Sequence, residues 1–271
     1  MDFAELKRVA DLVGERRGWS FDRMRAASDP APWEYEDVVR RYLQPSSQVL
    51  DIGTGGGERF LALAPFFGTG LGVDVSPAMI EVAQENTPPD LVGKVSFAIM
   101  PAEELRVPDH AFDIVLNRHS VVHVDEIVRV LRPGGFFITQ GVGSRNTQNI
   151  CAIFGCNPGG EYVSDVGHRW GTASESRAAF EERGCAFVAQ AEYDIRYWFL
   201  DVESLLFWLK AIPIPQDFEI ERHWRQVDHI LTEYQTPVGI DTNEHRELLI
   251  VRKLLGGQEQ TAQCRFIVAK A

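Results

Sequence analysis

The stretch VLDIGTGGG at residues 49–57 places one aspartate and three glycines at alternate positions: Asp51, Gly53, Gly55 and Gly57. Apolar residues precede the turn and a helical pattern follows it. Glycines there let the chain bend sharply and bring backbone N–H groups close to a ligand. The stretch completes neither the GxGxxG dinucleotide fingerprint nor the GK[ST] ending of a P-loop, so we expect another ligand.

A second carboxylate, Asp74, closes the next apolar run at residues 70–75. Its distance along the chain from the glycines is close to that of a ribose-binding acid in a βαβ unit. A carboxylate can accept hydrogen bonds from both ribose hydroxyls. The alternative role, capping the following helix, is already filled by Ser76, which precedes Pro77. We therefore predict that Asp74 binds a ribose.

A histidine, His119, follows a further apolar run at residues 112–117. Imidazole titrates near neutrality, which suits removal of a proton from a hydroxyl or amine. We predict His119 as the catalytic base. The alternative, that it packs or orients a substrate without proton transfer, stays open.

The elements that must position these residues alternate along the chain. Strand patterns are expected at 49–52, 70–75, 95–100, 112–117 and 136–140, and helical patterns at 58–67, 77–85 and 124–131. Such alternation predicts a doubly wound α/β fold with a parallel sheet and a switch point beside the first strand. Two helices are expected before residue 45. Beyond 141 we expect a helix at 174–183, a strand at 186–191, helices near 217–234 and 243–255, and a strand at 265–270.

Five segments between residues 48 and 140 together resemble the motifs of class I S-adenosylmethionine (AdoMet)-dependent methyltransferases, in the same order. They are the DxGxGxG turn at 51–57, GVDVSPAM at 72–79, AEEL at 102–105, AFDIVLN at 111–117 and LRPGGFFI at 131–138. The wider pattern resembles the methyltransferase type 11 group. The resemblance implies a Rossmann-like sheet of seven strands, the last one antiparallel.

Combining the resemblance with the patterns divides the chain into four parts. They are an N-terminal helical segment (1–45), an AdoMet-binding core (46–191), a helical cap inserted before the last strand (192–263) and a final core strand (264–271).

The resemblance also implies a set of residues that contact AdoMet or its product, S-adenosylhomocysteine. They are Asp51, Gly53, Thr54, Gly55, Asp74, Val75, Met79, Ala102, Glu103 and Asn117. Many relatives carry an aspartate just before the alanine, where this chain has Pro101, so the contact with the adenine amine passes to Glu103 or to water. Met79 fits plain helix core nearly as well as an adenine contact.

The acceptor is expected to contact Arg118, His123 and Trp198. Aromatic side chains give large contact areas in concave sites, and an arginine can pair with an acidic group. The aromatic stretch around Trp198 fits core packing between cap and sheet equally well.

Composition limits the partners. The formal net charge is −12 and the basic residues are scattered, which argues against nucleic acid. No apolar run of membrane-spanning length and no signal-peptide pattern is evident, so we expect a cytoplasmic protein without a membrane partner. The four cysteines form no CxxC pair, so no metal is expected.

These observations predict an AdoMet-dependent methyltransferase that acts on the oxygen, nitrogen or carbon of a small molecule. Two alternatives stay open: an RNA or protein methyltransferase, which needs a basic face, and a regulator that binds AdoMet without catalysis. A dinucleotide oxidoreductase is disfavoured by the glycine spacing.

Overall fold

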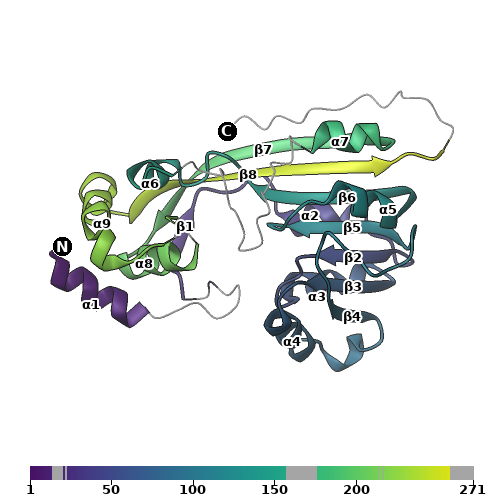
Figure 1. The fold of residues 1–271 in the computed structure, drawn as a ribbon, viewed down its shortest axis with the longest axis horizontal. Helices are drawn as coiled ribbons and strands as arrows, with labels where there is room; N and C mark the ends of the chain where they lie inside the picture. The colour runs from purple at the N-terminus through teal and green to yellow at the C-terminus, as the bar shows by residue number, and fades with distance from the viewer. Residues whose placement is uncertain (14–20, 22, 157–175, 213, 216, 257–271) are drawn as a thin grey trace.

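The computed structural model describes residues 1–13, 21, 23–156, 176–212, 214–215 and 217–256 (Figure 1). Its described strands form one eight-stranded sheet in the order β1-β7-β8-β6-β5-β2-β3-β4. In that order the strands are β1 (Ala26–Ser28), β7 (Cys185–Phe199), β8 (Ile240–Lys253), β6 (Leu131–Val142), β5 (Phe112–Arg118), β2 (Gln48–Ile52), β3 (Thr69–Asp74) and β4 (Val95–Ile99).

Strands β4, β3, β2, β5 and β6 are parallel, and β8 runs antiparallel between β6 and β7. This confirms the predicted α/β fold, with an antiparallel strand near one edge. The chain reverses its order at β2, which pairs with β3 on one side and β5 on the other. Ligands of doubly wound sheets bind outside the carboxyl ends of the strands at such a switch point.

Two expectations about the sheet need correction. The edge strand β1, which pairs with β7, was not expected and brings the number of strands to eight. The helix expected near 243–255 is wrong, because β8 occupies residues 240–253 and is the antiparallel strand. Its apolar residues 248–251 are all buried, as is typical of a strand covered on both faces. The strand expected at 265–270 lies outside the described residues.

Helices cover both faces of the parallel strands. On one face, side chains of α5 (Val124–Val130) and α7 (Arg177–Glu182) share a buried cluster with those of β2, β5 and β6. On the other, α2 (Tyr35–Arg40), α3 (Glu58–Leu63) and the 3-10 turn Ala64–Phe66 do the same. Helix α4 (Pro77–Glu85) packs on β3 and β4, which the 3-10 turn Pro89–Leu91 helps to connect.

A second group of helices lies beyond the carboxyl ends of the parallel strands. Figure 1 shows the long strands β7 and β8 running side by side from the sheet to this group. It contains α1 (Phe3–Val13), α6 (Gln148–Ile153), α8 (Val202–Ala211) and α9 (Ile220–Tyr234), which share one apolar core. The helical cap is thus drawn from both ends of the chain, because α1 buries Leu6, Ala10 and Val13 there.

Among the described residues, no helix is both long and apolar enough to span a bilayer.

Candidate active site at the carboxyl edge of the sheet

The glycine turn follows β2 and opens α3. Gly53, Gly55 and Gly57 have φ angles of 75°, 57° and 77°, a left-handed region in which a side chain is strained. A Cβ on Gly53 would lie 2.3 Å from Oγ of Ser120, whereas a Cβ on Gly55 would have no atom within 4 Å. The turn therefore packs tightly at Gly53 and leaves its backbone open to a ligand at Gly55.

Asp74 closes β3 beside this turn and is only 9% exposed. Its Oδ2 accepts a hydrogen bond of 3.0 Å from the N–H of Gly55, and its Oδ1 accepts one of 2.9 Å from the N–H of Ser76. A carboxylate has about four acceptor positions, so Asp74 keeps the capacity to bind hydroxyl donors of a ligand. Asp74 therefore holds the glycine turn through Gly55, the residue beside which the structure leaves open space for a ligand.

Asp51 provides a second carboxyl group next to the turn. Burial raises the pKa of Asp51 to about 7; the Thr54 hydroxyl opposes this shift and the neighbouring Asp74 carboxylate adds to it. Two carboxyl groups that share a poorly hydrated site favour a cationic ligand, because a positive charge stabilises the ionised form of both. The turn is thus suited to a cation.

Asn117 lies in β5, next to β2, and is 1% exposed. Its amide Nδ2 donates to the carbonyl of Val121 at 3.1 Å, and its Oδ1 accepts from the hydroxyl of Thr139 at 3.0 Å. The prediction allowed a contact with the cofactor through the backbone or the side-chain amide of Asn117. The two bonds of the amide join β5, β6 and the loop after β5, and the contact with the cofactor stays a prediction. The bond to Thr139 could not be predicted from the residues around Asn117, because Thr139 lies in the neighbouring strand β6.

His119 begins the loop after β5 with a left-handed φ of 55°. Its backbone N–H donates to the carbonyl of Gln140 at 2.9 Å, and its Nε2 is buried without a partner among the described residues. Burial, together with the charges of Arg118, Arg246 and Arg59, holds the pKa of His119 well below its ordinary value. The ring is therefore neutral near pH 7 and has one nitrogen available for a ligand.

A hollow of about 330 Å³ lies where β5 and β6 end. Its lining residues come from the end of β1 and the segment that follows it, from α2 and α3, and from the strands β5, β6, β7 and β8. They are Ser28, Asp29, Pro30, Ala31, Trp33, Glu34, Tyr35, Glu36, Arg59, Arg118, Gln140, Tyr193, Glu244 and Arg246. Of these, the sequence analysis singled out Arg118 alone for the site.

The other two residues expected to bind the acceptor do not line this hollow. His123 lies with its Nε2 3.9 Å from Oε2 of Glu103, so it joins a residue assigned to the adenine side. Trp198 is 9% exposed on β7, and the guanidinium of Arg196 lies 4.8 Å from the centre of its ring. Trp198 is therefore a buried residue of β7 outside the hollow, and its Nε1 has no hydrogen-bond partner among the described residues.

The remaining residues expected to contact the cofactor surround the end of β3. Val75 is 67% exposed directly after Asp74, and Met79 is 7% exposed in α4. Ala102, after β4, packs against the buried cluster that includes α5. Their positions agree with an adenosine-binding edge, although the burial of Met79 agrees equally well with a helix core residue.

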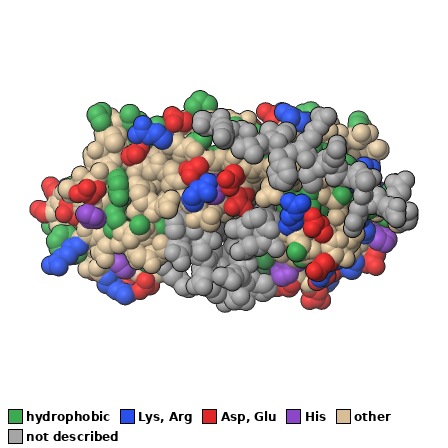
Figure 2. Space-filling model, turned by 90° about the horizontal axis from the view of Figure 1, so that it is seen from above, with side chains coloured by type: hydrophobic (Ala, Val, Ile, Leu, Met, Phe, Trp, Pro, Cys, Tyr) green, Lys and Arg blue, Asp and Glu red, His purple; other side chains and the backbone are tan. Residues whose placement is uncertain are grey.

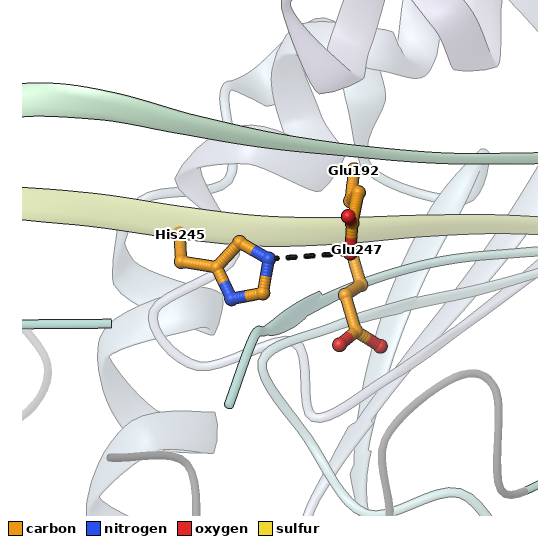
Figure 3. Close-up of side chains that lie close together, drawn as sticks. All are labelled: Glu192, His245 and Glu247. Atoms are coloured by element: carbon orange, nitrogen blue, oxygen red, sulfur yellow. Dashed lines mark hydrogen bonds and ion pairs between the residues drawn. The ribbon is translucent and has the colours of Figure 1, made fainter. Parts of the chain in front are cut away.

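Glu192, His245 and Glu247 form a cluster with atoms close enough to hold a metal ion (Figure 3). Nδ1 of His245 accepts the backbone N–H of Arg145 at 3.0 Å, so a neutral ring carries its proton on Nε2. That nitrogen lies 3.4 Å from Oε2 of Glu192, and the guanidinium of Arg145 is 3.2 Å away. A protonated nitrogen beside a cation is unsuited to bind a metal, and the cluster is instead an ion-pair network.

Comparison with known proteins identifies the central part of this chain. Residues 50–139 match the family model described as "Methyltransferase domain". They include the glycine turn, Asp74 and the end of β5, which surround the switch point. Residues 50–139 form a methyltransferase domain, and their homologues are class I AdoMet-dependent methyltransferases. This family implies AdoMet as the methyl donor.

The relatives match over the same region. The chain is 33% identical over 116 residues to 2-methyl-6-phytyl-1,4-hydroquinone methyltransferase of Synechocystis sp., and the match covers 40% of this chain and 36% of that protein. It is 38% identical over 98 residues to the uncharacterized methyltransferase YcgJ of Bacillus subtilis, covering 34% of this chain and 39% of YcgJ. The chain thus spans under half the length of these curated relatives.

Solved structures extend the likeness of fold beyond the domain. The crystal structure of YcgJ superposes with a TM-score of 0.59 at 21% identity, covering 82% of this chain and 99% of that one. The [4+2]-cyclase SpnF superposes with a TM-score of 0.52 at 20% identity, covering 82% of this chain and 81% of that one. Since a cyclase shares this fold, the fold alone does not specify methyl transfer.

Proposed function

We propose that this protein transfers a methyl group from AdoMet to a small molecule held in the hollow at the ends of β5 and β6. The supporting observation is the adjacency of two features: a glycine turn flanked by two carboxyl groups, and the hollow that begins at Arg118. Ile52, directly before the turn, pairs with Asn117 of β5, and the next residue, Arg118, lines the hollow. The proposed donor and acceptor sites are therefore neighbours at the end of β5.

The residues around the turn fit AdoMet. The open backbone at Gly55 gives room for the ligand, Asp74 accepts the ribose hydroxyls, and Asp51 with Asp74 balances its positive charge. When bound, AdoMet supplies an electrophilic methyl group and a neutral leaving thioether. The chain has to hold the acceptor in line and exclude water, and such positioning alone can supply much of the rate.

His119 directly follows Arg118, which lines the hollow, and lies two residues after Asn117, which is predicted to contact AdoMet. Because its pKa is held well below the ordinary value, its ring is neutral and has a nitrogen that accepts or donates a hydrogen bond. It orients the acceptor, or takes a proton from an acceptor hydroxyl or amine as the methyl group is transferred. A depressed pKa makes the ring a weak base, which favours the orienting role.

Charge supports a small acceptor over a nucleic acid. The hollow is lined by acidic as well as basic side chains, and the formal net charge is −12. On the face drawn in Figure 2, Lys and Arg side chains are interspersed with Asp and Glu side chains. A nucleic acid requires clustered positive charge, because the neutralisation of phosphates dominates its binding.

The test has two steps. Calorimetry should show binding of AdoMet and S-adenosylhomocysteine but not of NADH. Incubation with methyl-labelled AdoMet and a metabolite extract should then give label in the small-molecule fraction. Asp74→Ala should weaken AdoMet binding by at least tenfold and reduce the labelling, whereas Asp90→Ala, at an exposed position in the turn Pro89–Leu91, should leave both unchanged. Preference for NADH, or label in protein or RNA instead, would overturn the proposal; binding without labelled product would indicate the regulator.

A further inference from the structure

Among the residues that the structure describes, one cation of the hollow has no counter-ion. Arg59 pairs with Glu36, and Arg246 lies 3.1 Å from the carboxylate of Glu244. Arg118 also lines the hollow, but within the described residues it makes no hydrogen bond or ion pair, and its Nε is fully buried. The lining of the hollow thus contains two satisfied arginines and one unsatisfied arginine.

An unpaired guanidinium away from water is unfavourable, because the protein does not replace the hydration that the charge has lost. The surroundings reflect this cost, since burial and the positive charges of Arg59 and Arg246 lower the pKa of Arg118 while Glu36 opposes the shift. The other acidic residues of the lining, Asp29 and Glu34, are exposed at its rim. A bound anion would supply what Arg118 lacks.

The carboxyl group of Asp51 is the remaining candidate for a counter-ion. The charge of Arg118 acts on it and opposes the rise of its pKa, but among the described residues no salt bridge joins the two side chains. Burial still raises the pKa of Asp51 to about 7, which leaves the carboxyl group partly protonated at neutral pH. Arg118 is therefore free to bind a ligand from the hollow.

Three aromatic side chains form the walls around Arg118, and their polar atoms are already satisfied. Nε1 of Trp33 donates to Gln140 at 2.9 Å, the hydroxyl of Tyr35 donates to the carbonyl of Ile138 at 3.0 Å, and the hydroxyl of Tyr193 donates to Glu244 at 2.6 Å. Trp33 and Tyr193 also meet edge to face, with ring centres 4.8 Å apart. These bonds fix the rings, so that they offer apolar surface to a ligand.

We propose that the methyl acceptor is a small acid with an apolar or aromatic body, whose carboxylate or phosphate group pairs with Arg118 while Trp33, Tyr35 and Tyr193 enclose its body. This inference rests on the proposed function, because it places the acceptor in the same hollow. A planar guanidinium binds either anion through two parallel hydrogen bonds. An amine is disfavoured, since Glu36 and Glu244 are already paired with arginines.

Binding of simple probes to the 271-residue chain saturated with S-adenosylhomocysteine tests this proposal. Binding of benzoate, phenyl phosphate, benzyl alcohol and benzylamine is measured by calorimetry and by the fluorescence of tryptophan. We expect benzoate or phenyl phosphate to bind at least tenfold more tightly than the alcohol or the amine, and the stronger of the two identifies the anion. Equal binding of benzoate, phenyl phosphate and benzyl alcohol, or no binding of either anion at millimolar concentration, would overturn the proposal.

The variant Arg118→Gln should lose at least tenfold in affinity for the preferred anion. Arg23→Gln is the matched control, because Arg23 is exposed and lies 3.8 Å from Glu203 in the cap region. Both variants should bind S-adenosylhomocysteine as the wild type does. Loss of that binding would count against the proposed AdoMet site, whereas unchanged anion affinity in a folded Arg118→Gln protein would contradict the proposal of an acidic acceptor. If Arg118→Gln does not fold, the proposal is tested by the wild type alone, which should bind benzoate or phenyl phosphate at least tenfold more tightly than benzyl alcohol.

Discussion

The backbone N–H of Gly55 and the carboxylate of Asp74 are joined by a hydrogen bond of 3.0 Å. This bond ties the glycine turn after β2 to the end of the neighbouring strand β3. Under the proposed function Asp74 would act on the ligand in two ways, since it sets the conformation of the turn and also presents acceptor oxygens. Removal of its carboxylate should disturb both parts of the donor site together.

Substitution Asp74→Ala should weaken AdoMet binding by at least tenfold, which corresponds to about 1.4 kcal/mol. The physical reason is the loss of charge-assisted hydrogen bonds to the ligand and of the bond that orders Gly55. Titration calorimetry measures the change against Asp90→Ala. An Asp74→Ala protein with wild-type affinity would remove this residue from the site.

The glycines of the turn should differ in what they tolerate. Gly53→Ala combines a left-handed φ with a Cβ 2.3 Å from Oγ of Ser120. It should lower the free energy of unfolding by about 2 kcal/mol or more, the sum of a backbone cost of about 1–2 kcal/mol and crowding. Gly55→Ala has free space and should cost only about 1 kcal/mol, yet it should impair AdoMet binding. Urea denaturation and calorimetry separate the two effects.

The contact between Gly53 and Ser120 can be tested by compensation. Adding Ser120→Gly to Gly53→Ala removes the clashing atoms but leaves the backbone strain. The double variant should therefore recover part of the lost stability. No recovery would mean that the crowding at Ser120 is relieved in another way.

AdoMet affinity should depend on pH through Asp51. Its pKa is about 7 in the folded protein and 3.8 ordinarily, so the folded protein holds a proton that the unfolded chain releases between these values. The stability from this proton is complete below the ordinary pKa and lost as pH rises through 7. A cationic ligand favours the ionised form, so AdoMet should bind more tightly at pH 8 than at pH 6. Asp51→Asn should flatten this dependence; a persisting slope would assign it to another group.

His119 should not titrate in the usual histidine range. Its folded pKa lies well below the ordinary value of 6.5, so lowering the pH through 6.5 should protonate it in the unfolded chain only and reduce stability there. Turnover should accordingly show no His119-dependent inflection near pH 6.5. His119→Asn, which tolerates a left-handed backbone, should reduce turnover at saturating AdoMet by about tenfold or more while AdoMet affinity stays unchanged. Equal turnover would leave the ring without a role in the reaction.

Arg118 should lower the stability of the protein without a bound acid. Replacing an unpaired, partly buried charge by an apolar side chain removes its desolvation cost, so Arg118→Leu should raise the free energy of unfolding by about 1 kcal/mol. Urea denaturation with and without benzoate measures it. The wild type should gain stability from benzoate, and the variant should not. A destabilised Arg118→Leu protein would show that the guanidinium is satisfied without a ligand.

Much of the core could be predicted from short ranges of sequence. The strands β2, β3, β4 and β5 and the helix α4 lie close to where the apolar runs and Ser76 placed them. The pattern failed at β8, where EHRELLIVRK has charges at helical spacing. That segment is a strand because its buried residues pair with β6 on one side and β7 on the other, and this pairing is a long-range property.

The sequence by itself determined the proposed donor site of this protein. A glycine turn and an acid that follow successive parallel strands meet at one edge of the sheet, because the carboxyl ends of parallel strands lie at the same edge. Only the tertiary structure decided the proposed acceptor site. The antiparallel insertion of β8 between β6 and β7 brings Glu244 and Arg246 to Arg118 and Tyr35, residues far apart in the chain. Burial there, which no local pattern encodes, leaves Arg118 unpaired and keeps His119 neutral.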